Sequence, residues 1–236
     1  MGRKWRAFQY FQISMRKPPY RGNEQAMSEH DDAIEKSGFH WRIMRWILWR
    51  FIRNAAERVL KDRSLRNKAS SEIRWLQNDI DLFLSQVSTR TALLRPVAQL
   101  DALPNFGSRL MVELAIYTVA ADRTLRDRDL DPQSARDALA DIGWSVYHRQ
   151  LALSSLPARL VTRDHTHFTH CPPQSFARRI ADETGDPEAL AGFANSWCKY
   201  DWPGADLIAA DGHRGHYIRR QTLSAGDPVC DMCWAA

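Results

Sequence analysis

The sequence predicts an α+β protein in which N-terminal helices precede a small antiparallel β-sheet meander with short helices packed on it. Apolar residues recur at helical spacing through roughly the first 150 residues, which indicates amphipathic helices. The last third instead holds short alternating segments, separated by turn signals such as Gly204 and the pair Gly226 and Asp227. Because helices and strands occupy separate stretches, α+β is the natural class. With 44% apolar and 26% charged residues, the chain has enough apolar material for a buried core.

Three helices are expected in the N-terminal part of the chain. The charged run over residues 24–36 predicts a short helix that ends at Gly38. Helical periods predict two more helices over residues 40–63 and 65–87.

A domain boundary is expected after these helices. Pro96 and the stretch 104–107, which contains Pro104 and Gly107, interrupt the helical pattern. We therefore expect an Arg- and Trp-rich helical extension over residues 1–90 and an α+β domain over residues 91–236.

The helix over residues 40–63 has more than one apolar face. At about 100° per residue, one wide face holds Trp41, Met44, Ile47, Leu48, Phe51, Ile52, Ala55 and Val59. The other side holds Arg42, Trp46, Trp49, Arg50 and Arg53, and Arg45 lies at the border between the two faces. Such a helix is usually buried by protein, and we favour that interpretation. Peripheral contact with an anionic membrane is the alternative. Nucleic acid is not expected, because no recognised binding motif accompanies the arginines.

Caps, prolines and glycines bound the remaining elements. Helices are predicted to begin at Ser108, at Asp131 with Pro132, at Pro172 with Pro173, and at Asp186 with Pro187, and Gly185 ends the third of them. Strands are predicted over residues 162–171, 205–210, 216–223 and 229–234.

Histidines and a cysteine are concentrated in the first predicted strand. On a strand, His165, His167 and Cys171 share one face, and His170 lies on the other. Two histidines and a cysteine on one face could contribute ligands to zinc, yet a polar edge strand has the same pattern. We expect a site without a cofactor, with zinc as the alternative.

Two further cysteine patterns bear on catalysis. Cys198 lies beside Lys199 and three residues before Asp201, a setting that could stabilise a thiolate nucleophile. A lone cysteine is also commonly a small buried apolar residue, and the local sequence leaves both interpretations open. Cys230 and Cys233 have CxxC spacing, but on a strand their side chains point to opposite faces, so a thioredoxin-like site is not expected.

Several residues of the last third form a combined pattern. They are Cys171 with Pro172, Cys198, Asp201, Arg220, Thr222, Gly226, and Cys230 with Asp231, preceded by helices that contain Tyr117 and Trp144. With these residues, the chain over 90–236 resembles the L-2-amino-thiazoline-4-carboxylic acid (ATC) hydrolase family. The resemblance implies a hydrolase of a non-peptide C–N or C=N bond in a small cyclic amidine or thiazoline carboxylate. The family reaction converts L-2-amino-thiazoline-4-carboxylate into N-carbamoyl-cysteine.

The resemblance also implies catalytic roles. Cys198 would be the nucleophile, with Cys171 and Cys230 as near-equal candidates. Asp201 or His170 would act as the acid and base.

The same resemblance implies a substrate pocket. Arg220 would anchor a substrate carboxylate, and Thr222 and Asp231 would line the pocket. Met232 and Cys233 stand where the family typically has Phe and Arg, so the substrate could differ from the thiazoline acid.

A second resemblance gives the alternative function. The C-terminal pattern is also similar to vinyl-reductase-type ligand-binding domains, which bind small molecules and use a cysteine cluster for zinc. It implies a non-catalytic small-ligand or zinc-binding sensor. If zinc binds, the expected ligands are Cys198, Cys230, His165 and His167.

Composition also bears on location and partners. The start of the chain lacks the apolar region of a signal peptide, and the four cysteines are typical of a reducing compartment. No stretch approaches about 18 uncharged apolar residues, so no transmembrane segment is expected. We expect a cytoplasmic protein with a small-molecule substrate, and self-association into a homo-oligomer is left open.

Overall fold

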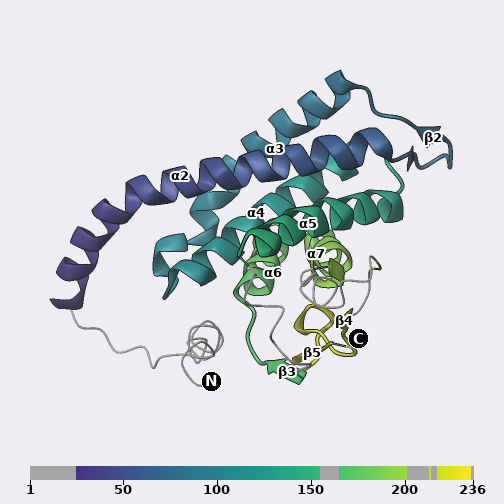
Figure 1. The fold of residues 1–236 in the computed structure, drawn as a ribbon. Helices are drawn as coiled ribbons and strands as arrows, with labels where there is room; N and C mark the ends of the chain where they lie inside the picture. Colours follow the sequence, from purple (N-terminus) through teal and green to yellow (C-terminus); the bar gives the residue numbers. More distant parts are fainter. Residues whose placement is uncertain (1–24, 155–164, 201–212, 214–216, 235–236) are drawn as a thin grey trace.

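The computed structural model describes residues 25–154, 165–200, 213 and 217–234 (Figure 1). The helices are α2 (Gln25–Asp62), α3 (Gln77–Ala98), α4 (Phe106–Arg126), α5 (Pro132–Ser154), α6 (Pro172–Thr184) and α7 (Pro187–Tyr200). The strands are β1 (Leu65–Arg66), β2 (Glu72–Ile73), β3 (His165–Phe168), β4 (Tyr217–Ile218) and β5 (Cys230–Trp234). Two one-turn helices, η1 (Leu100–Ala102) and η3 (Leu223–Ala225), complete the described elements. The predicted α+β class is confirmed.

The C-terminal sheet has its last strand in the middle. β5 pairs with β3 on one side and with β4 on the other, both antiparallel. The order therefore differs from the predicted meander, in which successive strands would be neighbours. β3 is shorter than the predicted strand 162–171, and the predicted strand 216–223 is wrong at its end, because Leu223 begins η3. The predicted strand 205–210 lies outside the described residues.

Helix α4 lies at the centre of the bundle. It contacts α3, α5, α6 and α7, and most of its side chains are buried. Its buried residues are Gly107, Ser108, Val112, Glu113, Leu114, Ala115, Ile116, Tyr117, Val119, Ala120, Ala121, Asp122, Thr124 and Leu125. A helix covered on all sides is typical of the middle of a core, and Figure 1 shows the other helices around it.

One apolar core crosses the predicted domain boundary. It runs from Leu48 in α2 to Cys198 in α7, so the segments on both sides of residue 90 contribute to it. Trp49 belongs to this packing, because its ring stacks on Tyr117 with 5.5 Å between centroids. The expectation that Trp49 lies among the outward arginines is therefore wrong, whereas Trp46 is indeed exposed.

Two predicted helix limits are wrong for local reasons. Gly38 does not end a helix, because a single glycine costs only about 1 kcal/mol relative to alanine and α2 continues through it. The predicted helix 65–87 is replaced at its start by the β1–β2 hairpin. There the Oδ1 of Asn67 accepts the Ser71 N–H at 2.8 Å, which offers the backbone a turn in place of a helix.

Two more limits shift by a few residues. Pro96 lies inside the last turn of α3, where the Val97 carbonyl accepts a hydrogen bond from Arg179 of α6 at 2.9 Å. The cap of α4 is Asn105 and not Ser108, because the Asn105 side chain accepts the Ser108 N–H at 2.8 Å. Pro96 removes one backbone hydrogen bond of α3, and the helix continues for only two residues beyond it, to Ala98.

The other predicted helix signals are confirmed. Asp131 caps α5 by accepting the Ser134 N–H at 2.8 Å, and Pro132 is its first residue. Gly185 ends α6 with a φ of 63°, a left-handed conformation that favours glycine. Pro187 then begins α7.

An ion-pair network joins α4 to the turn between α6 and α7. Asp186, in that turn, accepts hydrogen bonds from Arg123 Nε at 2.9 Å and from Arg126 Nη1 and Nη2 at 3.1 and 2.8 Å. Arg126 Nε donates in addition to Oδ2 of Asp122 at 2.9 Å. Asp122 is only 2% exposed. Charge-assisted hydrogen bonds therefore hold α6 and α7 on α4, in addition to apolar contacts.

Asp122 also lies directly against the backbone of α7. A Cβ built at Gly192 would come within 2.4 Å of Oδ1 of Asp122, much closer than any real contact. Only a residue without a side chain lets α7 lie on this carboxylate. The position of α7 on α4, and with it the position of Cys198 two turns later, depends on this contact.

The two carboxylates of the network respond differently to their surroundings. Burial raises the pKa of Asp122 to about 6, although the charge and hydrogen bond of Arg126 act in the opposite direction. At Asp186 burial also acts upward, but the hydrogen bonds and charges of Arg126 and Arg123 lower its pKa. Arg126 therefore stabilises the ionised form of Asp186, while Asp122 stays costly to ionise.

We predict that Gly192→Ala destabilises the protein by about 1–3 kcal/mol, the usual cost of overpacking. The added methyl group would push Asp122 or α7 out of position. Chemical denaturation with urea would measure the free energy of unfolding. Gly143→Ala is the matched control, because a Cβ there meets no atom within 4 Å and alanine favours a helix. Equal stabilities of the two variants would contradict the role of Gly192.

We predict that Asp122→Asn changes how stability depends on pH. Because folding raises the pKa of Asp122 from 3.8 to about 6, the folded protein binds more protons than the unfolded chain between these values. Its stability therefore falls as the pH rises through that window. From about pH 4 to pH 7, Asp122→Asn should gain about 2 kcal/mol relative to the wild type in urea unfolding. Asp182→Asn, on the exposed side of α6, controls for net charge, and a constant difference across the range would contradict the prediction.

Candidate active site

The turn formed by η3 brings four predicted site residues together. Cys198 reaches it from the end of α7, Thr222 directly precedes it, and Cys230 and Asp231 reach it from the start of β5. Figure 1 shows this part of the chain beside α6 and α7, on the side of the bundle opposite α2. Gly226 ends the turn with a φ of 96°, which explains the need for glycine at this position.

Five successive backbone N–H groups around η3 donate to side chains. Oδ1 of Asp231 accepts from the N–H groups of Arg220 at 2.8 Å and Gln221 at 2.7 Å. Oδ2 of Asp227 accepts from the Thr222 N–H at 2.7 Å. Sγ of Cys230 accepts from the Leu223 N–H at 3.2 Å, and Oγ1 of Thr222 accepts from the Ser224 N–H at 3.3 Å. Successive N–H groups make a concavity that favours negative charge. The acceptors here are two carboxylates, the sulfur of Cys230 and the hydroxyl of Thr222.

The two buried thiols lie against the same turn. Sγ of Cys198 is 3.1 Å from Oγ of Ser224, and Sγ of Cys230 is 3.5 Å from Oγ1 of Thr222. Either partner can donate in each pair. Because the Ser224 N–H donates to the Thr222 hydroxyl, hydrogen bonds connect the surroundings of both thiols. Cys198 and Cys230 are 9% and 6% exposed, so both sulfurs are largely shielded from water.

Side chains of α6 and the segment before η3 hold the turn in place. Gln174 Nε2 and Arg178 Nη2, both on α6, donate to the Leu223 carbonyl at 3.4 Å each. Arg219 Nη1 donates to the Cys198 carbonyl at 3.0 Å, which ties the chain before η3 to the end of α7. The site is thus assembled from α6, α7, η3 and β5.

The remaining predicted site residues have different positions. Cys171 is the half-buried cap of α6, in the same first turn as Gln174, and His170 before it is exposed. Arg220 is held at its backbone by Asp231, and its side chain is exposed. Asp201 lies outside the described residues.

The histidine strand lies next to the cysteine strand. In the register of β3 and β5, His167 is opposite Asp231 and His165 is opposite Cys233. Because β3 ends at Phe168, the expected alternation does not extend to Cys171, which begins α6. Among the described residues, no three His, Cys, Asp or Glu side chains come together as a metal site.

Two residues of the site were not among the predicted ones. Ser224 contacts the thiol of Cys198, and Asp227 holds the Thr222 N–H. Their signal in the sequence is local: a threonine, then a serine two residues later, then Gly226 and Asp227, a composition typical of turns held by side chains.

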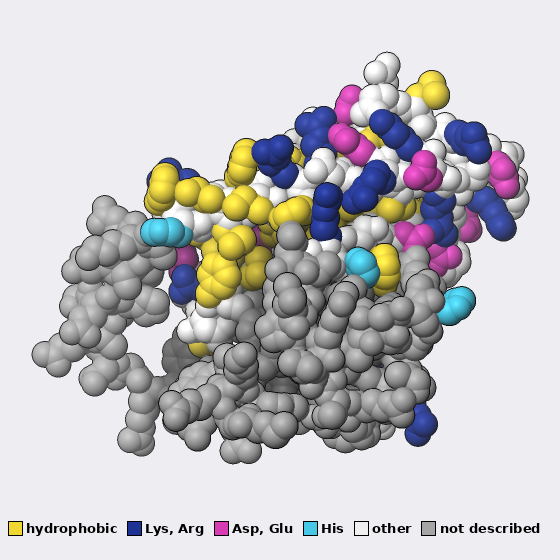
Figure 2. Space-filling model, viewed as in Figure 1, with side chains coloured by type: hydrophobic (Ala, Val, Ile, Leu, Met, Phe, Trp, Pro, Cys, Tyr) yellow, Lys and Arg dark blue, Asp and Glu magenta, His cyan; other side chains and the backbone are white. Residues whose placement is uncertain are grey.

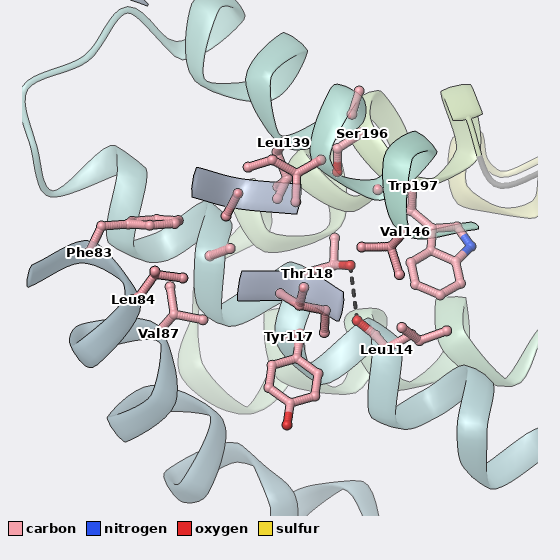
Figure 3. Close-up of a pocket in the computed structure, with 16 residues that line it drawn as sticks. Phe83, Leu84, Val87, Leu114, Tyr117, Thr118, Leu139, Val146, Ser196 and Trp197 are labelled. Carbon is pink, nitrogen blue, oxygen red and sulfur yellow. Dashed lines mark hydrogen bonds between the residues drawn. The ribbon is translucent and has the colours of Figure 1, made fainter. Parts of the chain in front are cut away.

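A separate cavity of about 50 Å³ lies inside the helical bundle (Figure 3). Helices α2, α3, α4, α5 and α7 line it with mostly apolar side chains, among them Phe83, Leu139 and Trp197. Two hydroxyls in its wall are already bonded to their own helices: Thr118 donates to the Leu114 carbonyl at 3.0 Å, and Ser196 to the Gly192 carbonyl at 2.6 Å. The cavity therefore offers an apolar surface.

Comparison with protein-family models, with curated proteins and with solved structures finds no match for this chain. Among the helices of the described residues, none is long and apolar enough to cross a membrane. Function is therefore inferred from the contacts around η3 and from the resemblance in residues 90–236.

Proposed function

We propose that this protein is a cysteine-dependent hydrolase that acts on the C–N or C=N system of a small cyclic amidine or thiazoline carboxylate. The observation that supports this proposal is the placement of Cys198 and Cys230 against one turn rich in hydroxyl and N–H donors. The Leu223 N–H donates to Sγ of Cys230, and the Ser224 hydroxyl is able to donate to Sγ of Cys198. A donor to sulfur stabilises negative charge on it, which a nucleophilic cysteine requires. The substrate class comes from the resemblance to ATC hydrolases.

The proposed reaction uses one cysteine and one water molecule. The Cys198 thiolate adds to the amidine carbon of the ring, and the ring nitrogen takes a proton. The ring carbon–sulfur bond then breaks, so that the substrate sulfur leaves as a thiolate and the carbon stays bound to Cys198. Water adds to this carbon and loses its protons, and Cys198 leaves as a thiolate. The product is N-carbamoyl-cysteine.

The surrounding groups take distinct parts in this proposal. Ser224, 3.1 Å from the sulfur of Cys198, is placed to hold or pass a proton there. The exposed Arg220 guanidinium would bind the substrate carboxylate. Asp231 is a positioning residue, because its carboxylate holds the backbone of the turn. Asp201 and His170 remain the candidates for the acid and base.

We predict that Cys198→Ser lowers kcat with L-2-amino-thiazoline-4-carboxylate by at least about a hundredfold, because a serine hydroxyl is a far weaker nucleophile at neutral pH. Release of the product thiol, followed with a chromogenic thiol reagent and mass spectrometry, measures the rate. Cys230→Ser and Cys171→Ala test the two other candidate nucleophiles in the same assay.

Ser196→Ala is the matched control for this experiment. Ser196 is buried on the same helix, but its hydroxyl is bonded to the Gly192 carbonyl of α7. Its kcat should stay within about twofold of the wild type. Activity that survives replacement of each of the three cysteines, or no turnover of any cyclic amidine by the wild type, would refute the proposal.

A second candidate function is favoured by the cavity. A mostly apolar space between the helices of a bundle, whose wall hydroxyls Thr118 and Ser196 are bonded to their own helices, suits the binding of a small apolar molecule. On this alternative the protein is a non-catalytic small-ligand sensor.

We predict for this alternative that xenon enters the cavity and that Ala140→Leu excludes it. Ala140 lines the cavity and is buried, so a leucine there fills the space. The xenon NMR chemical shift in the presence of the protein measures binding. Ala92→Leu adds the same side chain on the exposed surface of α3 and should leave the shift unchanged. An identical shift in all three proteins would argue against a ligand site in the bundle.

A further inference from the structure

We propose that the solvent-facing side of α2 over residues 39–50 binds an anionic membrane surface. Four large apolar side chains are exposed there: Phe39 (61%), Ile43 (41%), Trp46 (58%) and Ile47 (36%). Their spacing of four, three and one residues places them on one stripe of the helix.

This stripe lies on the side of α2 that faces away from the bundle. Leu48, Ile52 and Ala55 are buried in the core. At about 100° per residue, these three positions point roughly opposite Phe39 and Ile43. One face of α2 is therefore buried against the bundle, and the apolar stripe on the other face is exposed to solvent. Figure 2 shows hydrophobic side chains at the surface along α2, and contiguous apolar surface of this kind marks an interaction site.

Within the span of the stripe itself, the charged side chains are all of one sign, although α2 carries acidic residues such as Glu35 and Glu57 on either side of that span. Residues 39–56 contain four arginines and no aspartate or glutamate. Arg53 is paired with Glu57 and Asp81. Arg42 and Arg50 are exposed beside the stripe, and the guanidinium of Arg50 lies 4.8 Å from the centroid of the Trp46 ring.

This combination is complementary to anionic lipid. A helix that lies in a membrane interface places aromatic and aliphatic side chains among the upper acyl chains and its arginines at the headgroups. Tryptophan is enriched at the membrane–water interface, at the level of the headgroups. The stripe is about 12 Å long, from the rise of 1.5 Å per residue over residues 39–47.

A second copy of the chain is a poorer occupant of the same face. A two-fold contact made by this stripe would bring Arg42 and Arg50 of both helices to one interface. Residues 39–56 contain no acidic side chain, and the nearest acidic residues of α2, Glu35 and Glu57, lie outside the stripe. Like charges in such an interface oppose association, whereas anionic headgroups would attract them.

Co-sedimentation of the full chain with lipid vesicles tests the proposal. Vesicles of phosphatidylcholine with about one third phosphatidylglycerol should pellet the protein, and phosphatidylcholine alone should bind it at least about tenfold more weakly. Raising the salt from about 0.1 M to about 0.5 M should also weaken binding to the anionic vesicles. The variant Phe39→Ser, Ile43→Ser, Trp46→Ser should lose binding at least about tenfold.

A matched control replaces apolar residues that are exposed elsewhere. Leu76→Ser and Leu93→Ser, both 72% exposed and outside the stripe, should leave vesicle binding unchanged. Circular dichroism confirms that each variant is folded. Equal pelleting of the stripe variant and the wild type would overturn the proposal. A wild-type dimer in light scattering that dissociates in the stripe variant, without vesicle binding, would equally overturn it and assign the face to a second copy.

Discussion

The buried carboxylate of Asp122 constrains the packing of three helices. Arg126 holds it from one turn away, the same arginine binds Asp186 between α6 and α7, and the backbone of α7 lies on it at Gly192. Each contact requires the others, because a buried charge without its partner is far more costly than an apolar residue in its place. The end of α7, and therefore the thiol of Cys198, takes its position from this group. The position of the candidate site therefore depends on a side chain of the central helix α4.

The sequence could predict elements whose signals are local. Asp131 at the start of α5 and Gly185 at the end of α6 act through their own backbone geometry, so their neighbours suffice to identify them. Gly38 and Pro96 carry equally familiar signals, but neither ends its helix. A glycine costs a helix only about 1 kcal/mol, and α3 continues past Pro96 to Ala98. The β1–β2 hairpin escaped prediction because the side chain of Asn67 competes with a helical pattern that is otherwise sound.

The site shows the same division between local and tertiary causes. Thr222 and Asp231 could be selected from the sequence only through a resemblance, whereas Cys198 and Cys230 also stood out by their neighbours and spacing. The structure brings all four to one turn. Their chemical roles stay predictions. The contact of Ser224 with Cys198 joins residues that are far apart in the sequence, and the spacing of residues along a sequence does not predict such tertiary contacts. The β3–β5 register could not be predicted either, because it pairs residues 165–168 with residues 230–233, which are far apart in the sequence.

The five N–H groups around η3 have a consequence for local motion. A short turn near the surface usually exchanges its amide hydrogens with water quickly, because nothing holds them. Here residues 220–224 give theirs to carboxylates, a sulfur and a hydroxyl. These amide hydrogens should exchange as slowly as those of a helix. Their exchange rates should also change when one of the accepting side chains is modified. Alkylation of the Cys230 sulfur would release the Leu223 amide first, so a covalent event at the thiol becomes visible as faster deuterium uptake in the turn.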